Sequence, residues 1–208
     1  MAQLQDFLQY VLPYVPGCSD PLAEQFIRDI CIDFCAGSSI VQFTHDPISL
    51  VAGQTQYDID TPQGTEATLI LAASYRGTPM RVLKTGDNVF NGREIPSGNP
   101  SALLQSPKGT FTLDRTPESD QANVIQMLVS TKPKRSATGV DDVLLEYAYE
   151  IGQGVLGRLM LMPGQEFTKP EAAAVFTATY NAAKVTARIR GERSFGAAGT
   201  SVRPRAFG

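Results

Sequence analysis

The spacing of apolar residues changes twice along this chain of 208 residues, at about Ser39 and at about Val140. Outside these points apolar residues recur every three or four positions, which is the period of an amphipathic helix. Between them lie short β-like runs, such as "IVQFTHD", "ATLILAASYRG" and "NVIQMLVST", separated by turns rich in Pro and Gly. We therefore predict an α+β protein in which helical segments flank a β module.

The most strongly marked helix starts near residue 19. Ser19 or Asp20 can cap it, and Pro21 suits its first turn. Its apolar stripe contains Leu22, Phe26, Ile27, Ile30, Phe34 and Cys35. Because glycine commonly ends a helix, we predict that Gly37 is the C-cap residue.

The order of the segments predicts a domain organisation. Residues 1–38 and 139–191 are expected to pack into one helical bundle, because helices at both ends of the chain need apolar partners. Residues 39–138 are expected to form an inserted antiparallel β-sandwich or barrel, since no βαβ alternation indicates a parallel sheet. Residues 192–208 are expected to form an extended C-terminal arm.

Positive charge is concentrated at the C-terminal end. The net charge is −3, yet residues 188–208 carry five arginines and one acidic residue, so the rest of the chain is acidic. A basic tail on an acidic body suggests an acidic partner surface or nucleic acid. One interpretation is an ordinary disordered terminus. The other is an arm that becomes ordered on a partner protein.

In the second interpretation the arm carries the binding residues. Arg193, Arg203 and Arg205 would pair with carboxylates of the partner. Phe195 and Phe207 would be the apolar anchors. Direct binding to DNA is the weaker hypothesis, because nucleic-acid-binding proteins usually have a basic face on the folded domain.

Residues 152–157, "GQGVLG", match the G-x-G-x-x-G pattern of dinucleotide-binding proteins. That function requires a strand before Gly152, and too little chain follows Gly157 for a second βαβ half. The alternative is that Gly152, Gly154 and Gly157 permit close packing of a helix against another helix or a neighbouring subunit. We favour close packing, and a nucleotide-binding enzyme stays as the competing hypothesis.

No other pattern indicates catalysis, and we expect no enzyme, no cofactor and no metal site. His45 is the only imidazole, so a Ser-His-Asp or Cys-His site would have to use it. Glu146 and Glu150 fit a solvated helix face better than a catalytic carboxylate pair. The three cysteines, Cys18, Cys31 and Cys35, are expected to be small buried hydrophobes.

No apolar run is long enough for a membrane span, and the first residues lack the features of a signal peptide, so we expect a cytoplasmic site of synthesis.

The order of motifs over about residues 20–191 resembles the head-to-tail adaptor family of tailed bacteriophages, of the kind called tail tubular protein A in short-tailed phages. The resemblance rests on "IRDICIDFCAGSSIVQF", on "ISLVAGQTQYDID", and on a later Asn-Pro step, a Phe-x-Leu-x-x-x-Pro strand and a strand that ends in Lys-Pro. The resemblance also includes three later features. These are an acidic pair before a helix rich in small residues, a Pro-Gly turn, and a last Ala-rich helix with Tyr180. Where such proteins often have Trp after the Pro-Gly turn, this chain has Phe167.

The resemblance implies a structural role in the virion. About a dozen copies would form a homo-oligomeric ring in the neck, assembled in the host cytoplasm. The ring would lie beneath the portal protein, which the C-terminal arm would bind, and above a nozzle or tail-tube protein. Double-stranded DNA would pass through its channel without specific binding, which suits an acidic body.

Overall fold

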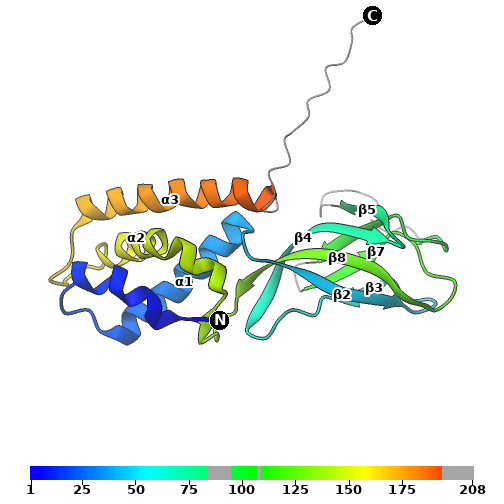
Figure 1. The fold of residues 1–208 in the computed structure, drawn as a ribbon, viewed down its shortest axis with the longest axis horizontal. Coiled ribbons are helices and arrows are strands. Elements are labelled where there is room, and N and C mark those ends of the chain that lie inside the picture. The colour runs from blue at the N-terminus through cyan, green and yellow to red at the C-terminus, as the bar shows by residue number, and fades with distance from the viewer. Residues whose placement is uncertain (84–94, 107–108, 194–208) are drawn as a thin grey trace, which may run out of the picture.

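The computed structural model describes residues 1–83, 95–106 and 109–193. Helices gather at one end of an elongated molecule and strands at the other, so the chain is a mixed α and β protein (Figure 1). Each end has its own cluster of buried hydrophobic residues. The α+β class predicted from the sequence is therefore confirmed.

The helical end is built from both ends of the chain. Its α-helices are α1 (Asp20–Ser38), α2 (Ala148–Leu159) and α3 (Pro170–Glu192). The 3₁₀ helices are η1 (Leu4–Tyr10), η2 (Leu12–Tyr14) and η4 (Asp142–Tyr147). A small antiparallel ribbon joins β1 (Ala2–Gln3) to β9 (Gly139–Val140), so the first residues lie against the segment that follows the β module.

One hydrophobic core joins these helices. Phe7 and Val11 of the N-terminal segment pack with Ile30 and Phe34 of α1 and with Val155 of α2. All five side chains are buried. Their spacing of three or four residues within each segment is the helical period seen in the sequence.

The end of α1 lies later than the sequence predicted. Gly37 is inside the last turn, and Ser39, with a φ of 51°, takes the left-handed conformation at the C-cap. Gly37 provides space instead, because a Cβ there would lie 2.9 Å from Cδ of Lys184 on α3. The prediction of Gly37 as the C-cap residue was wrong, because Ser39 and not Gly37 takes the left-handed conformation that ends the helix.

The β end is one seven-stranded sheet that curls into a half-barrel. Its strands are β2 (Gln42–Leu50), β3 (Gln56–Asp58), β4 (Thr65–Tyr75), β5 (Thr78–Leu83), β6 (Ala102–Ser106), β7 (Thr110–Leu113) and β8 (Gln121–Pro133). They pair in the order β2-β8-β4-β5-β6-β7-β3. Leu103, Phe111, Leu113, Ile125 and Val129 are fully buried on its inner face.

The sheet contains a parallel pair that the sequence did not predict. β5 and β6 run parallel, with Val82 opposite Leu103, whereas the other pairs of labelled strands are antiparallel. Parallel neighbours need a connection of about a dozen residues or more, and the chain between Leu83 and Ala102 is long enough. The prediction of a wholly antiparallel sandwich or barrel was wrong in this respect, because the module is a single mixed sheet.

Hydrogen bonds link the edge strand β2 to the segments around the other edge strand, β3. The N–H of Asp60, just after β3, donates to Nε2 of His45 on β2 at 3.1 Å. Nδ1 of the same ring lies 2.6 Å from the carbonyl oxygen of Asp46, to which it can donate in the tautomer that leaves Nε2 as the acceptor. The backbone thus engages both nitrogens of His45, the residue on which any imidazole catalysis would depend.

We expect His45→Phe to lower the free energy of unfolding by about 1–3 kcal/mol, because it leaves the Asp60 N–H and the Asp46 carbonyl without their ring partner. Urea denaturation followed by circular dichroism measures this change. Thr44→Val, at the neighbouring exposed position, is the control and should change stability by less than about 0.5 kcal/mol. Equal effects of the two substitutions would contradict a linking role for His45.

Candidate interaction surface

Three glycines of α2 let neighbouring elements come close to it. Gly152, Gly154 and Gly157 are all buried within the helix. An added Cβ would lie within 2.8 Å of another side chain in each case: Tyr10 of η1 at Gly152, Tyr180 of α3 at Gly154, and Thr177 of α3 at Gly157. All three glycines therefore face other elements of the same chain.

This placement decides what the "GQGVLG" segment can do chemically. The residues before Gly152 form η4 and the first turn of α2, so no strand precedes the motif. A dinucleotide site needs glycines at a strand-to-helix turn, where the backbone can approach a pyrophosphate. Because Tyr10, Tyr180 and Thr177 already occupy that space, these glycines have no room for a ligand.

A polar network fixes α3 on α1 beside this contact. The Tyr180 hydroxyl donates to Oδ2 of Asp33 at 2.6 Å, and Nζ of Lys184 lies 2.9 Å from the same oxygen. Burial opposes ionisation of Asp33, but these two hydrogen bonds and the charge of Lys184 outweigh it and lower its pKa. Burial and the bond to Asp33 raise the pKa of Tyr180. The tyrosine ring is held against Gly154 as a result.

The cysteines of α1 are buried in the same core. Burial raises the pKa of Cys31 to about 12 and raises that of Cys35 as well. Both thiols are therefore protonated at neutral pH and are not available as nucleophiles. Cys18 is half-buried, and burial together with the charge of Asp20 raises its pKa.

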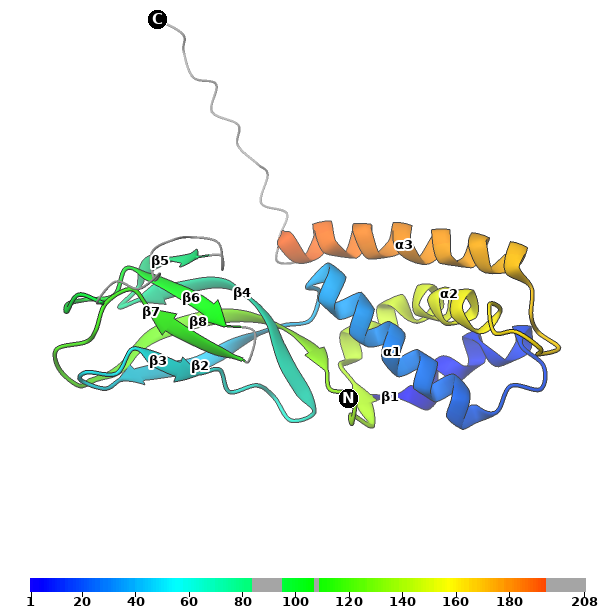
Figure 2. The same cartoon turned by 180° about the vertical axis from the view of Figure 1, so that it is seen from behind.

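The last turns of α3 lie at the junction between the helical end and the sheet (Figure 2). The side chain of Gln42, at the start of β2, donates to the carbonyl oxygen of Gly191 at 2.9 Å. A Cβ at Gly191 would lie 2.8 Å from the carbonyl oxygen of Ser38, so the helix end contacts the end of α1 directly. The position where the predicted arm begins is thus fixed relative to both parts of the molecule.

Two of the arginines counted with the basic tail belong to α3. Arg190 binds Oε2 of Glu146 on η4 at 2.7 Å and also donates to the hydroxyl of Tyr147. Arg188 pairs with Glu192 one turn later, at 2.9 Å. These contacts reduce the positive charge that the helix offers to a partner. Glu146, considered above as part of a carboxylate pair, is engaged in this ion pair.

The outer face of α3 carries an apolar row that sequence analysis missed. Val175, Val185 and Ile189 are 65%, 59% and 46% exposed. Ala174, Ala178 and Ala182 are exposed too, and their spacing places all six side chains on one side of the helix, opposite the side that faces α2. We call these six residues the outer row. No described element of the chain covers it (Figure 1).

A helix that is apolar on both faces is normally buried on both. The inner side of α3 contributes Ala173, Tyr180 and Ala187 to the core, while Ala and Val also occupy the outer side. This signal was present in the sequence, because residues 172–183 contain no charged side chain. The alanine-rich composition concealed it, since alanine favours helices whether exposed or buried.

The residues predicted to bind the portal are only partly placed. Arg193 caps the C-terminal end of α3 and is exposed. Phe195, Arg203, Arg205 and Phe207 lie outside the described residues. The structure therefore places the residue from which the predicted arm would continue, next to the outer row and the sheet, and the rest of the predicted arm lies outside the described residues.

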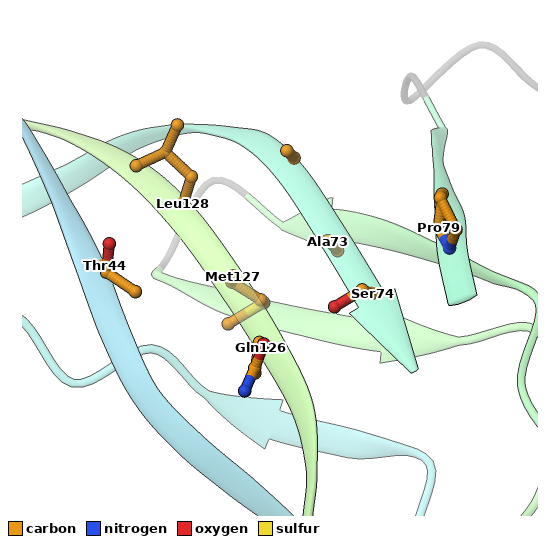
Figure 3. Close-up of a pocket in the computed structure, with 8 residues that line it drawn as sticks. Thr44, Ala73, Ser74, Pro79, Gln126, Met127 and Leu128 are labelled. Carbon is orange, nitrogen blue, oxygen red and sulfur yellow. The ribbon is translucent and has the colours of Figure 1, made fainter. Parts of the chain in front are cut away.

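A second uncovered surface lies on the outer face of the sheet. A shallow groove of about 340 Å³ runs over β2, β8, β4 and β5 and is lined by Thr44, Ala72, Ala73, Ser74, Pro79, Gln126, Met127 and Leu128 (Figure 3). Thr44, Leu128 and Ala72 are register partners on three adjacent strands. None of the lining residues is charged. We call this surface the sheet groove.

The described residues offer little else in the way of chemistry. They contain no group of three or more His, Cys, Asp or Glu side chains arranged to hold a metal ion. Among the described helices, none has the length and hydropathy needed to cross a bilayer. No protein-family model matches the sequence, and no curated protein matches it.

We expect Gly154→Ala to lower the free energy of unfolding by about 1–3 kcal/mol, because the new methyl group would overlap the Tyr180 ring, which Asp33 holds in place. Helix propensity alone would act in the opposite direction, by about 1 kcal/mol. Urea denaturation measures the difference. The control is Thr179→Ala on the exposed side of α3, where the higher helix propensity of alanine should give a stabilisation of up to about 0.7 kcal/mol. A stabilising effect of Gly154→Ala would contradict the close contact.

Asp33→Asn should destabilise the protein at neutral pH by at most about 1 kcal/mol, because the Asp33 side chain is 40% exposed and solvent screens its ion pair. The pKa of Asp33 is lowered from its usual 3.8, so this contribution is present above pH 3.8 and disappears as the pH falls through the folded-state value. Denaturation curves at pH 7 and pH 3 should show the variant and wild type converging at the acidic pH. Glu66→Gln, which breaks the exposed pair with Lys132, is the matched control with a smaller effect. A constant difference at both pH values would contradict this assignment.

Proposed function

We propose that this protein is a structural head-to-tail adaptor of a tailed bacteriophage, which assembles as a ring beneath the portal. The observation that carries the proposal is the outer row of α3, a long apolar face with no described partner in its own chain. A face of this kind on an otherwise complete domain is characteristic of a subunit interface. The sequence resemblance supplies the kind of assembly.

The domain organisation supports the same proposal. Helices from both ends of the chain would form the bundle, and the curled sheet would be the module inserted between them. In such a ring each copy uses two different surfaces, one toward each neighbour. The outer row and the sheet groove are two such surfaces, and both are free of charged side chains.

The arm completes the proposed role. It starts at Arg193, and the remainder of the predicted portal-binding set, Phe195, Arg203, Arg205 and Phe207, follows from that point. Since Arg188 and Arg190 are engaged in ion pairs on α3, the arginines proposed to meet the portal are those of the arm itself. DNA would pass through the ring channel, and the tail or nozzle protein would bind on the side away from the portal.

We expect the purified full-length protein to form a species of about a dozen chains as its concentration is raised. Sedimentation velocity or mass photometry measures this directly. Val185→Glu should lower the association constant by roughly 100-fold or more, because an unpaired carboxylate would be buried at the contact.

Val51→Glu is the matched control. It makes the same substitution at a 48% exposed valine in the β module, and it should leave assembly unchanged. Circular dichroism of both variants shows whether the fold is retained. A wild-type protein that stays monomeric at high micromolar concentration would contradict the proposal, as would equal effects of the two substitutions.

A further inference from the structure

The outer row and the sheet groove have matching chemistry. Four of the six outer-row residues lie in residues 172–183, which contain no charged side chain, and Val185 and Ile189 continue the row beyond Lys184. The groove is lined by Thr, Ala, Ser, Pro, Gln, Met and Leu side chains and is likewise uncharged. An ionic surface opposite either of them would lose its hydration without gaining a counter-charge. Each surface therefore suits an uncharged partner.

Their shapes also match. The outer row is a convex ridge of small side chains, in which Ala174, Ala178 and Ala182 allow a close approach. The sheet groove is shallow, and its lining includes the register partners Thr44, Leu128 and Ala72 on three adjacent strands. A helix covering one face of a sheet is the common way in which both elements bury apolar surface. Leu69 of β4, 48% exposed, extends the uncovered apolar surface of the sheet.

The two surfaces belong to different ends of one elongated chain (Figure 1). In the described structure α3 packs its inner side on α1 and α2, and its outer row does not contact the sheet groove of the same chain. Packing α3 against α3 of a second copy would be a two-fold contact, which closes at a dimer and leaves the groove uncovered. Packing the row into the groove of another copy covers both surfaces and can continue around a ring.

We propose that the outer row of α3 binds the sheet groove of the neighbouring copy, and that this contact joins the subunits. The occupant of the groove is thus a second copy of this chain. The inference rests on the proposed ring function and specifies which two surfaces meet.

Cysteine cross-linking between full-length chains tests the contact. In a Cys18→Ser background, the remaining native thiols, Cys31 and Cys35, are buried and do not react. One preparation carries Ala178→Cys on the outer row, and a second carries Thr44→Cys in the groove. After mixing and mild oxidation, we expect a disulfide-linked dimer on a non-reducing gel. Each single variant alone should give none, because every copy has both surfaces but carries only one of the two engineered thiols.

The matched control mixes Ala178→Cys with Val51→Cys, which places the thiol on the same module but outside the groove. This mixture should give no cross-linked dimer. Cross-linking of Ala178→Cys with itself would overturn the proposal in favour of a symmetric helix contact. Equal cross-linking of the Val51 control would also overturn it, since the reaction would then reflect random collision.

The mass of the assembled species, measured by mass photometry alongside the cross-linking, separates this inference from the proposed function. If rings form and the Ala178→Cys and Thr44→Cys mixture does not cross-link, the contact is wrong while the ring function stands. If the mixture cross-links but the wild type stops at a dimer, the contact is right and the ring is wrong. If the wild type does not associate at all, both are overturned.

Discussion

The helical end of this protein depends on how closely its helices approach one another. Along α2, Gly152, Gly154 and Gly157 present bare backbone to η1 and α3, and Gly37 does the same for α3 from α1. Interiors are packed to crystal-like density, so a single added carbon at such a position has to displace a neighbour. The Asp33, Tyr180 and Lys184 network makes that displacement harder by fixing the ring that Gly154 faces. The glycines and the hydrogen-bond network of Asp33, Tyr180 and Lys184 together set the position of α3.

The position of α3 in turn determines what the rest of the molecule exposes. With its inner side held against α1 and α2, the helix must present Val175, Val185 and Ile189 outward. Its last turn is attached to the start of β2 through Gln42 and Gly191, which places the C-terminal end of α3 between the two ends of the molecule. The proposed adaptor role would need this kind of geometry, because surfaces for neighbouring copies and for a partner would have to keep a fixed relation.

The β module has features that limit pairing of other chains with the two open edges of its sheet. A half-barrel leaves β2 and β3 as edge strands, and exposed edges invite pairing with other chains. Pro47 and two register irregularities interrupt β2, and β3 is only three residues long. The His45 ring links the two edges through backbone groups on both sides. These features leave the outer face of the sheet, rather than its edges, as the surface open to a partner.

The sequence alone determined the mixed α and β class and the placing of the strands between helical segments, because helical and strand periods are properties of neighbouring residues. It also indicated that the glycines of "GQGVLG" serve close packing, although it left open whether the contact lies within the chain or between subunits. Only the tertiary structure showed that Gly37 faces Lys184, that β5 and β6 run parallel, and that His45 joins the sheet edges. Each of these depends on which distant residues meet, and local spacing does not encode that. For the same reason the apolar residues of α3 could be recognised in the sequence, but which of them face outward was decided by the partners that cover the other side.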